Sequence, residues 1–321
     1  MHLNVDLTRK EATSESLASL EGVSHVVFAA VAEAPGLVAG WFDTKQMQLN
    51  LEMLQNCLEP LLSGKSRIEH VSIMQGTKAY GLHIHALDIP ARERAPRDPH
   101  PNFYWLQEDY LKKRARDVGF GYTIMRPPMV MGGAYGAVMN VATVLGAYAA
   151  ICREEGLPFG FPGGASYVTE ALDARLLGQA LVWAAYAPQA RNQHFNITNG
   201  DVFEFRSVWP AIADSLGMEV GPESPLSLAT FLPAKSAVWQ EVVRKFNLRP
   251  ISMGDLLGES HFVTDFLFGY GLETAPPPAF ISTIKLRKAG FARVCDTEDM
   301  FRYWLSDFID RRIFPSRDAQ S

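Results

Sequence analysis

Short apolar runs alternate with amphipathic helical stretches along the first half of the chain, and this alternation constrains the fold more than any other feature. Residues 23–31 form one apolar run of strand length. Leucine and methionine then recur at helical spacing over residues 46–62, and residues 68–74 form a second short apolar run. This order is typical of crossover units that build a parallel sheet, so we predict an α/β protein.

Later segments extend the pattern. Asn102 can cap a helix over residues 104–117, and Pro127-Pro128 should stop a strand that spans residues 121–131. After Gly156 the pattern changes. We therefore expect two domains, residues 1–156 around the sheet and residues 157–321 as a mixed segment that returns to the sheet and forms a smaller, mainly helical substrate lobe. The remaining predicted elements are helices over residues 139–155 and 169–186, a short strand over 193–197, and mainly helices from residue 203 onward.

Composition excludes several classes of function. The 321 residues are 47% hydrophobic, enough for a sizeable core. The net charge of −5 gives no basic footprint for nucleic acid, and no apolar run approaches the roughly 20 residues of a membrane span. Cys57, Cys152 and Cys295 are far apart and match no metal spacing, and the N-terminus lacks an apolar core of signal-peptide length. We expect a cytoplasmic protein.

Two polar side chains stand out as candidate catalytic residues. Lys78 follows the predicted strand over residues 68–74, and ligands bind beyond the carboxyl ends of such strands. Tyr104 lies in the first turn of the helix that Asn102 caps, where it can face a cleft. A nearby cation lowers the pKa of a phenol, which can then stabilise or protonate an oxyanion. Considered alone, the aromatic run Phe103-Tyr104-Trp105 is more often packing than catalysis.

Several further motifs give the chain a family resemblance. It resembles, over essentially its whole length, the progesterone 5β-reductase and iridoid synthase family of atypical extended short-chain dehydrogenases. The motifs that carry the resemblance are Lys78, Asn102-Phe103-Tyr104-Trp105, Glu108-Asp109, Arg126-Pro127, Met139-Asn140, Tyr148-Ala149-Ala150-Ile151-Cys152, Asn196-Ile197-Thr198-Asn199-Gly200-Asp201-Val202-Phe203, Val238-Trp239 and Gly290-Phe291.

This resemblance implies a Rossmann-like, doubly wound parallel sheet and NADPH-dependent reduction of the C=C bond of an α,β-unsaturated carbonyl compound. The family's two catalytic residues correspond to Lys78 and Tyr104. Tyr104 would hold the enolate oxygen, and Lys78 would keep the phenol acidic. Most short-chain reductases place this lysine four residues after the tyrosine, where this chain has Glu108. A carboxylate there should raise the pKa of the tyrosine, so the cation must come from elsewhere.

The resemblance also implies cofactor and substrate contacts. Asp6 and Leu7 match a pair that lies against the adenine of NADPH, and the substrate side corresponds to Leu82 or His83. Gln75 is displaced by one position from the family's glutamine, which puts its contact in question. For each apolar position, ordinary core packing is the alternative reading. The other implied cofactor contacts are Ala30 and Val31 after one strand, Tyr104, and Val130, Ala137, Val138 and Met139 on the nicotinamide side.

One family feature has no counterpart in the sequence. Members open with a strand, a GxxGxxG turn and a helix, and nothing of this kind precedes Asp6. The sheet should therefore be N-terminally incomplete, and the chain as given should hold NADPH poorly. We interpret this as an incomplete N-terminus rather than a damaged paralogue. It predicts that residues 1–7 lack strand partners and that residues 26–28 form an exposed sheet edge.

Two other functions compete with enone reduction. A nucleotide-sugar epimerase or dehydratase shares the extended fold, but Glu108 replaces its usual lysine. A non-catalytic dinucleotide-fold sensor would explain the absent glycine-rich turn but not the retained Lys78 and Tyr104. His83 and His85 could ligate a metal, yet no third ligand has suitable spacing, so we expect none. Arg311-Arg312 and the charges around Arg92 would matter only at an oligomer interface, such as that of a homodimer.

Overall fold

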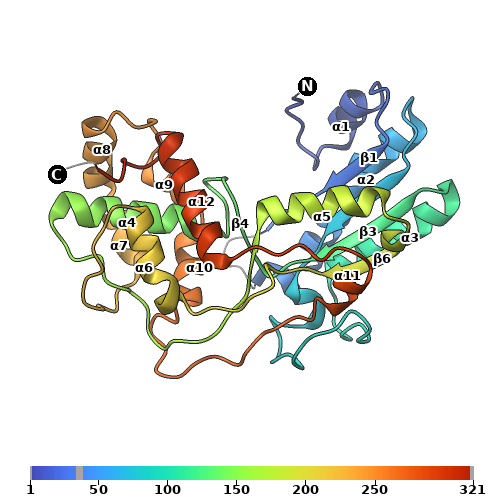
Figure 1. Cartoon of the computed structure of the whole chain (residues 1–321). Coiled ribbons are helices and arrows are strands. Elements are labelled where there is room, and N and C mark those ends of the chain that lie inside the picture. The colour runs from blue at the N-terminus through green and yellow to red at the C-terminus, as the bar shows by residue number, and fades with distance from the viewer. Residues whose placement is uncertain (1, 34–38, 319–321) are drawn as a thin grey trace. The chain divides into compact units, whose positions relative to one another are not determined.

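The computed structural model describes residues 2–33 and 39–318 and divides into two compact units (Figure 1). The chain crosses between the units five times, whereas the sequence suggested one boundary at residue 156. Unit 1 comprises Met1–Pro127, Leu177–Ile197 and Ile281–Ala292, and unit 2 comprises Pro128–Leu176, Thr198–Phe280 and Arg293–Ser321.

A parallel sheet forms the centre of unit 1. Its four strands have the order β1-β2-β3-β6, and every neighbouring pair is parallel. The predicted parallel α/β architecture is confirmed, including the late strand that returns to the sheet. The bounds are His25–Phe28 for β1, His70–Met74 for β2, Gly121–Arg126 for β3 and Gln193–Asn196 for β6.

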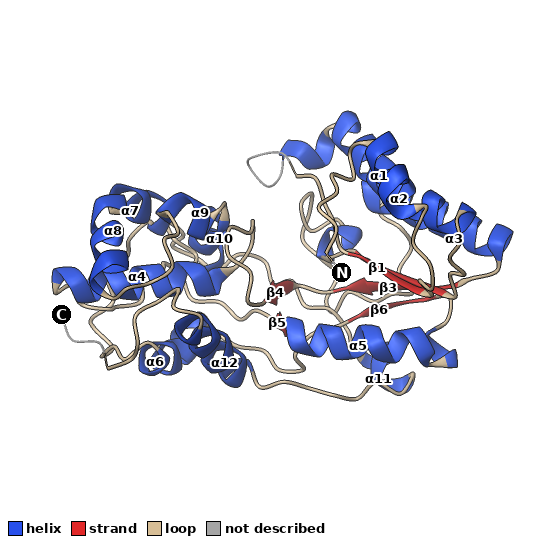
Figure 2. Cartoon of the chain, turned by 90° about the horizontal axis from the view of Figure 1, so that it is seen from above, coloured by secondary structure: helices blue, strands red, loops and turns tan. Residues whose placement is uncertain are grey.

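Helices cover both faces of this sheet. Helices α2 (Thr44–Ser63) and α3 (Phe103–Val118) lie on one face, and α5 (Ala174–Tyr186) and α11 (Ile284–Lys288) lie on the other (Figure 2). Under α2 and α3, fully buried residues include Leu54, Leu58, Val71, Leu111 and Ile124. Burial of such a side chain contributes about 1.5–3 kcal/mol. The shorter helices of unit 1 are α1 (Lys10–Leu17), η1 (Ala39–Phe42), η2 (Thr77–Tyr80) and η3 (Pro188–Ala190).

Strand β1 is an edge of the sheet, as predicted. Val27, in the middle of this strand, is 53% exposed. Within the described residues, the segment 2–7 contains no strand, which also agrees with the prediction. This segment is attached instead to helix α2, because the Asn56 side chain donates a hydrogen bond to the Leu7 carbonyl at 2.9 Å.

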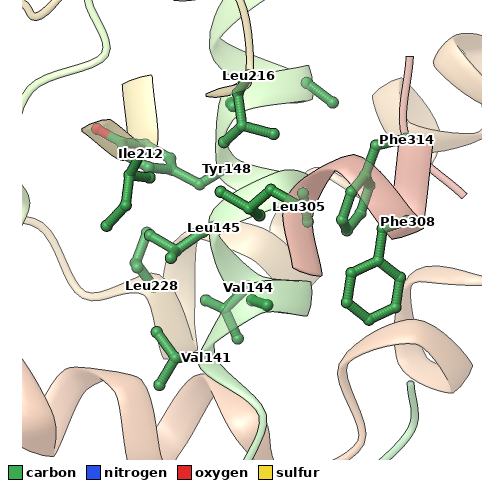
Figure 3. Packing of buried hydrophobic residues seen from close by; sticks show 14 of the residues in the cluster. Val141, Val144, Leu145, Tyr148, Ile212, Leu216, Leu228, Leu305, Phe308 and Phe314 are labelled. Carbon is green, nitrogen blue, oxygen red and sulfur yellow. The ribbon is translucent and has the colours of Figure 1, made fainter. Parts of the chain in front are cut away.

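Helix α4 (Val141–Glu155) is the centre of the unit 2 core (Figure 3). Gly146 lets Phe314 pack directly on this helix, because a β-carbon at Gly146 would lie 2.1 Å from the phenyl ring. The other elements of unit 2 are β4 (Met129–Met131), β5 (Ala171–Asp173), α6 (Phe205–Ser215), α7 (Leu228–Ala234), α8 (Ser236–Lys245), α9 (Met253–Leu257), α10 (Ser260–Leu267) and α12 (Thr297–Asp310).

Two predicted elements need correction. The strand expected over residues 121–131 is interrupted at Pro127-Pro128, so its last residues form the separate strand β4, which pairs with β5. The helix expected over residues 169–186 begins only at Ala174. The Asp173 carboxylate accepts the Arg175 backbone N–H at 2.7 Å, and this bond satisfies a donor at the start of α5.

Candidate active site

Lys78 lies just beyond the carboxyl end of β2. The strand ends at Met74, and the chain then turns through Gln75-Gly76 into the single turn η2 that carries Lys78. The lysine side chain is 23% exposed. Its position agrees with the prediction that it follows a strand end, where open α/β sheets bind their ligands.

Tyr104 lies in the first turn of α3. The Asn102 side chain caps this helix, because its Oδ1 accepts the Tyr104 backbone N–H at 3.0 Å, as the sequence predicted. The phenol reaches back to the end of β2. A β-carbon built on Gly76 would lie 3.3 Å from the Tyr104 hydroxyl, so the absence of a side chain at Gly76 leaves room for the phenol.

Trp41 brings the two candidate catalytic residues to one place. The Lys78 Nζ lies 4.0 Å from the centre of the Trp41 ring, and the Tyr104 ring centre lies 5.1 Å from it. Asn102 adds a second connection, since its Nδ2 donates to the Lys78 carbonyl at 3.0 Å. Lys78 and Tyr104 therefore face the same indole, although they come from distant parts of the sequence.

Glu33 is the carboxylate nearest to this pair. Its Oε1 accepts from the Trp41 Nε1 at 2.7 Å and from the Lys78 Nζ at 3.3 Å. The segment that leads to Glu33 is held by the buried Asn50, which accepts the Ala32 backbone N–H at 2.9 Å and donates to the Ala32 carbonyl at 2.8 Å. Burial lowers the pKa of Lys78, and the charge of Glu33 opposes this shift.

A buried polar cluster lies on the other side of Gln75. The Arg126 guanidinium donates to the Gln75 Oε1 at 2.8 Å, to the Tyr80 hydroxyl at 3.3 Å and to the Glu108 Oε2 at 3.3 Å. The Gln75 Nε2 donates in turn to the Tyr104 carbonyl at 3.2 Å. The amide of Gln75 is thus bonded within the protein. Its contact with a cofactor remains a prediction.

The charge of Glu108 is neutralised locally. Burial opposes ionisation of this carboxyl, but the hydrogen bond from Lys112 and the charges of Arg126, Lys112 and Arg97 prevail and lower its pKa to about 2. The sequence alone predicts that this carboxylate, four residues after Tyr104, raises the pKa of the phenol. That prediction names the wrong carboxylate, because the carboxylate that raises the pKa of Tyr104 is Glu33 and not Glu108.

The pKa of Tyr104 also differs from expectation. Burial and the charge of Glu33 raise it well above the ordinary tyrosine value, and Arg126 is the cation that opposes this shift. The expectation of an acidic phenol is therefore wrong, whereas the influence of Lys78 on Tyr104 stays a prediction. Tyr104 is a neutral phenol at physiological pH, and a neutral phenol donates a hydrogen bond.

The other predicted contacts are spread over both units. Ala30 and Val31 follow β1, and Val31 is 50% exposed. The Asp6 carboxylate accepts the backbone N–H and the hydroxyl of Thr8 at 3.0 and 2.7 Å. Val130, Ala137, Val138 and Met139 belong to unit 2. The cofactor contacts of all these residues remain predictions.

The predicted substrate residues Leu82 and His83 follow η2. Leu82 is exposed, and the His83 ring packs edge-on against Trp41 with centres 5.5 Å apart. Neither ring nitrogen of His83 has a hydrogen-bond partner, and burial lowers the pKa of this histidine to about 4. His83 is therefore neutral at physiological pH.

The sequence alone does not reveal that Glu33, Trp41 and Asn50 belong to the site, and it gives no role to Arg126. The one usable signal in the sequence is Arg126 at the end of an apolar strand. An arginine in that position is expected to be buried, and a buried guanidinium needs carboxylate and amide partners. Glu33 and Trp41 gave no signal, since they meet Lys78 only through the tertiary fold.

Metal-ligand clusters and membrane-spanning helices are both absent from the described part of the chain. No group of three or more histidine, cysteine, aspartate or glutamate side chains among residues 2–33 and 39–318 could hold a metal ion. No helix within the same ranges is both long enough and apolar enough to cross a membrane.

The parallel sheet, covered by helices on both faces, defines an α/β protein with a Rossmann-like fold. The family described as "PRISE-like Rossmann-fold domain" matches residues 6–260, and the chain belongs to this family. The resemblance inferred from the sequence motifs is thereby confirmed.

Curated relatives cover nearly the whole chain. An (S)-8-oxocitronellyl enol synthase of Antirrhinum majus is 29% identical over 328 residues, which span 98% of this chain and 80% of the relative. A 3-oxo-Delta(4,5)-steroid 5-beta-reductase of Arabidopsis thaliana is 28% identical, again over 98% of this chain and 80% of the relative. Both of these relatives carry the name of an enzyme.

Solved structures show the same fold at lower identity. RMD from Pseudomonas aeruginosa, complexed with NADPH, has a TM-score of 0.64 at 15% identity and covers 96% of this chain and 88% of its own. A UDP-glucose 4-epimerase from Thermotoga maritima has a TM-score of 0.62 at 15% identity, with 95% and 83% covered. At such identities the likeness concerns the fold alone.

Proposed function

We propose that this protein reduces the C=C bond of α,β-unsaturated carbonyl compounds with NADPH. The observation that carries the proposal is the meeting of Lys78 and Tyr104 at Trp41, with Asn102 bonded to both of their backbones. The names of the curated relatives support it, because one is a steroid 5-beta-reductase and the other an enol synthase.

The carboxyl edge of the unit 1 sheet fits a dinucleotide. Parallel strands β1 and β2 end side by side there, and Val31 offers an exposed apolar surface just after β1. We assign Ala30 and Val31 to the cofactor side of this edge. When bound, NADPH supplies the hydride that adds to the β-carbon of the substrate.

Tyr104 has the central role among the protein's own residues. As the β-carbon accepts the hydride, the electrons of the C=C bond move onto the carbonyl oxygen and produce an enolate. The neutral phenol of Tyr104 donates a hydrogen bond to that oxygen and stabilises its growing negative charge. A proton from solvent water then adds to the α-carbon, which leaves hydroxide for the buffer to neutralise and gives the saturated carbonyl compound.

Lys78 and Glu33 set the electrostatic conditions around the phenol. Glu33 disfavours the phenolate, so Tyr104 keeps the hydrogen with which it bonds the enolate oxygen. The ammonium of Lys78 offsets the carboxylate and favours negative charge on the substrate oxygen. Leu82 and His83, next to Trp41, are the residues that we expect to contact the substrate.

Epimerase chemistry has weaker support in the site itself. The position four residues after Tyr104 holds Glu108, which is buried and bonded to Arg126. The competing sensor hypothesis makes a different experimental prediction, namely NADPH binding without turnover.

The test is NADPH oxidation by the protein, with 2-cyclohexen-1-one as the substrate. Tyr104→Phe should lower kcat by about two to three orders of magnitude and leave NADPH affinity nearly unchanged, because it removes a donor to the transition state.

Tyr110→Phe is the matched control. It removes a phenol hydroxyl from the same helix, but that hydroxyl donates to Glu59 at 2.7 Å, outside the site. Full activity of Tyr104→Phe would remove Tyr104 from the mechanism. NADPH binding without turnover of any enone by the wild-type protein would favour the sensor function instead.

A further inference from the structure

A chain of polar contacts leads from a surface loop to the backbones of both candidate catalytic residues. It begins at Asp98, whose Oδ1 bonds the His100 Nδ1 at 2.8 Å. The His100 Nε2 lies 3.3 Å from the Asn102 Nδ2. Asn102, which is 3% exposed, then contacts the Lys78 carbonyl and the Tyr104 backbone N–H, each at 3.0 Å.

The orientation of the Asn102 amide follows from these partners. The Tyr104 N–H can only donate, so it faces the amide oxygen, and the Lys78 carbonyl can only accept, so it faces the amide nitrogen. Both ends of one side chain are used at once. A carboxylate could still cap the helix but could not donate to Lys78, and a hydroxyl or methyl group is too short to span both partners.

His100 completes the arrangement. The Asn102 nitrogen has a second hydrogen to donate, and His100 accepts it only with an Nε2 that carries no hydrogen. The bond to the Asp98 carboxylate places the ring hydrogen on Nδ1 and so selects this tautomer. Asp98 is fixed in turn by His85. Gly81 allows this approach, because a β-carbon there would lie 2.7 Å from the Asp98 Oδ2.

We propose that Asn102 is a positioning residue, which we call the latch, that holds the lysine-bearing turn η2 against the tyrosine-bearing start of α3. His100, oriented by Asp98, holds the latch in its working orientation. This inference rests on the proposed function, because the separation of Lys78 and Tyr104 matters to a reaction that uses both. The latch acts through the backbones of Lys78 and Tyr104, which it bonds with the two ends of its amide.

Asn102→Asp separates the latch from ordinary helix capping. The carboxylate still accepts the Tyr104 N–H, so the cap is kept, but it repels the Lys78 carbonyl. We expect kcat for the enone to fall by about tenfold to a hundredfold, with the KM for NADPH within about twofold, because a shift of about 1 Å between catalytic groups has effects of this size. A role limited to capping predicts no loss of activity.

Hydrogen–deuterium exchange tests the latch without any substrate. In Asn102→Asp, the amides of residues 76–81 should exchange faster, whereas those at the start of α3 should not change. Asp43→Ala is the control, since Asp43 caps α2 by accepting the Lys45 N–H at 2.8 Å and contacts neither Lys78 nor Tyr104. It should affect only the start of α2.

His100 provides a graded test. Gln at this position offers an acceptor for Asn102 without the ring, so His100→Gln should retain more activity than His100→Ala. Wild-type exchange over residues 76–81 together with wild-type kcat in Asn102→Asp would overturn the latch. If the wild-type protein reduces no enone, the proposed function fails, and the exchange result alone decides whether the latch exists.

Discussion

Two pairs of opposite charge each contain one group that acts on Tyr104, and the pairs differ in how completely the protein encloses them. The nitrogen–oxygen distance is 3.3 Å both in Lys78–Glu33 and in Arg126–Glu108. The side chains of the first pair are 23% and 11% exposed, whereas those of the second are 6% and 4% exposed. Arg126 also bonds Gln75 and Tyr80, while Lys78 lies over the face of Trp41.

Because of this difference in exposure, we interpret Arg126–Glu108 as a structural pair. We call Lys78–Glu33, the more exposed pair, the working pair. A buried ion pair with all its hydrogen bonds satisfied is costly to break, because the remaining charge has no solvent. A pair near the surface contributes less to stability and can respond to a ligand. One member of each pair shifts the Tyr104 pKa, and in opposite directions, since Glu33 raises it and Arg126 lowers it.

Removal of the cation of each pair, Arg126 or Lys78, should give the largest difference between the pairs, seen in the free energy of unfolding. Arg126→Met leaves Glu108 buried with less compensation, and we expect a loss of about 3–5 kcal/mol in the free energy of unfolding. Lys78→Met should cost about 1 kcal/mol or less, because its pair is closer to solvent. Urea denaturation of both variants measures the difference. Equal losses would show that the two pairs are not distinct in this way.

The second contrast concerns acid stability. Glu108 has a pKa of about 2 in the folded protein, below its ordinary value of 4.5. A lowered carboxyl pKa stabilises the fold above pH 4.5, and this contribution is lost as the pH falls from about 4.5 to about 2. The loss amounts to about 3 kcal/mol. Glu108→Gln should therefore be less stable than wild type at pH 7, and the gap should close in acid. A gap that stays constant with pH would contradict this account.

A smaller effect is expected from the working pair. The charge of Glu33 raises the pKa values of both Lys78 and Tyr104, so Glu33→Gln should lower both. The alkaline limb of the kcat/KM profile should then move to lower pH. Glu59→Gln is a suitable control, because Glu59 pairs with Arg114 away from the site. An unmoved limb, or one displaced to higher pH, would argue against an electrostatic role for Glu33.

The smallest expected effect lies at Gly76, which stands between Gln75, the hydrogen-bond partner of Arg126, and Lys78 of the other pair. Its φ of −168° suits any residue, so Gly76→Ala should hardly change stability. The new β-carbon would lie 3.3 Å from the Tyr104 hydroxyl and displace it slightly, which should lower kcat about threefold to tenfold. Gly178→Ala, which meets no neighbour within 4 Å, serves as the control. Equal kcat in both variants would remove Gly76 from the site.

The sequence predicted the elements with strong periodicity and clear caps. Helix α3 begins within one residue of its expected start, because Asn102 provides the cap that the sequence shows. Strand β5 was missed, since Ala171-Leu172-Asp173 has neither the length nor the alternation of a strand and is defined only by its pairing with β4. Propensity cannot reveal a three-residue strand that depends on a partner 40 residues away.

The candidate site was predicted in its residues but not in its electrostatics. Lys78 and Tyr104 could be identified because they form recognisable motifs next to a strand end and a helix cap. The effect of Glu108 was misjudged because Lys112, one turn further along the same helix, and Arg126, at the end of β3, neutralise its charge together. Glu33 reaches Lys78 across 45 residues of chain. A pKa depends on such distant charges, and their distances exist only in the folded molecule.

The discontinuity of unit 1 bears on how the protein can be produced and dissected. Ser282 donates its backbone N–H to the Ala91 carbonyl at 2.9 Å, and β6 joins the sheet only through residues 193–196. During synthesis, the chain must therefore be made as far as Ala292 before this unit has all its parts. No single truncation point yields either unit whole, so fragments cut at one site should be prone to aggregation, and insertions for split reporters belong in surface loops instead.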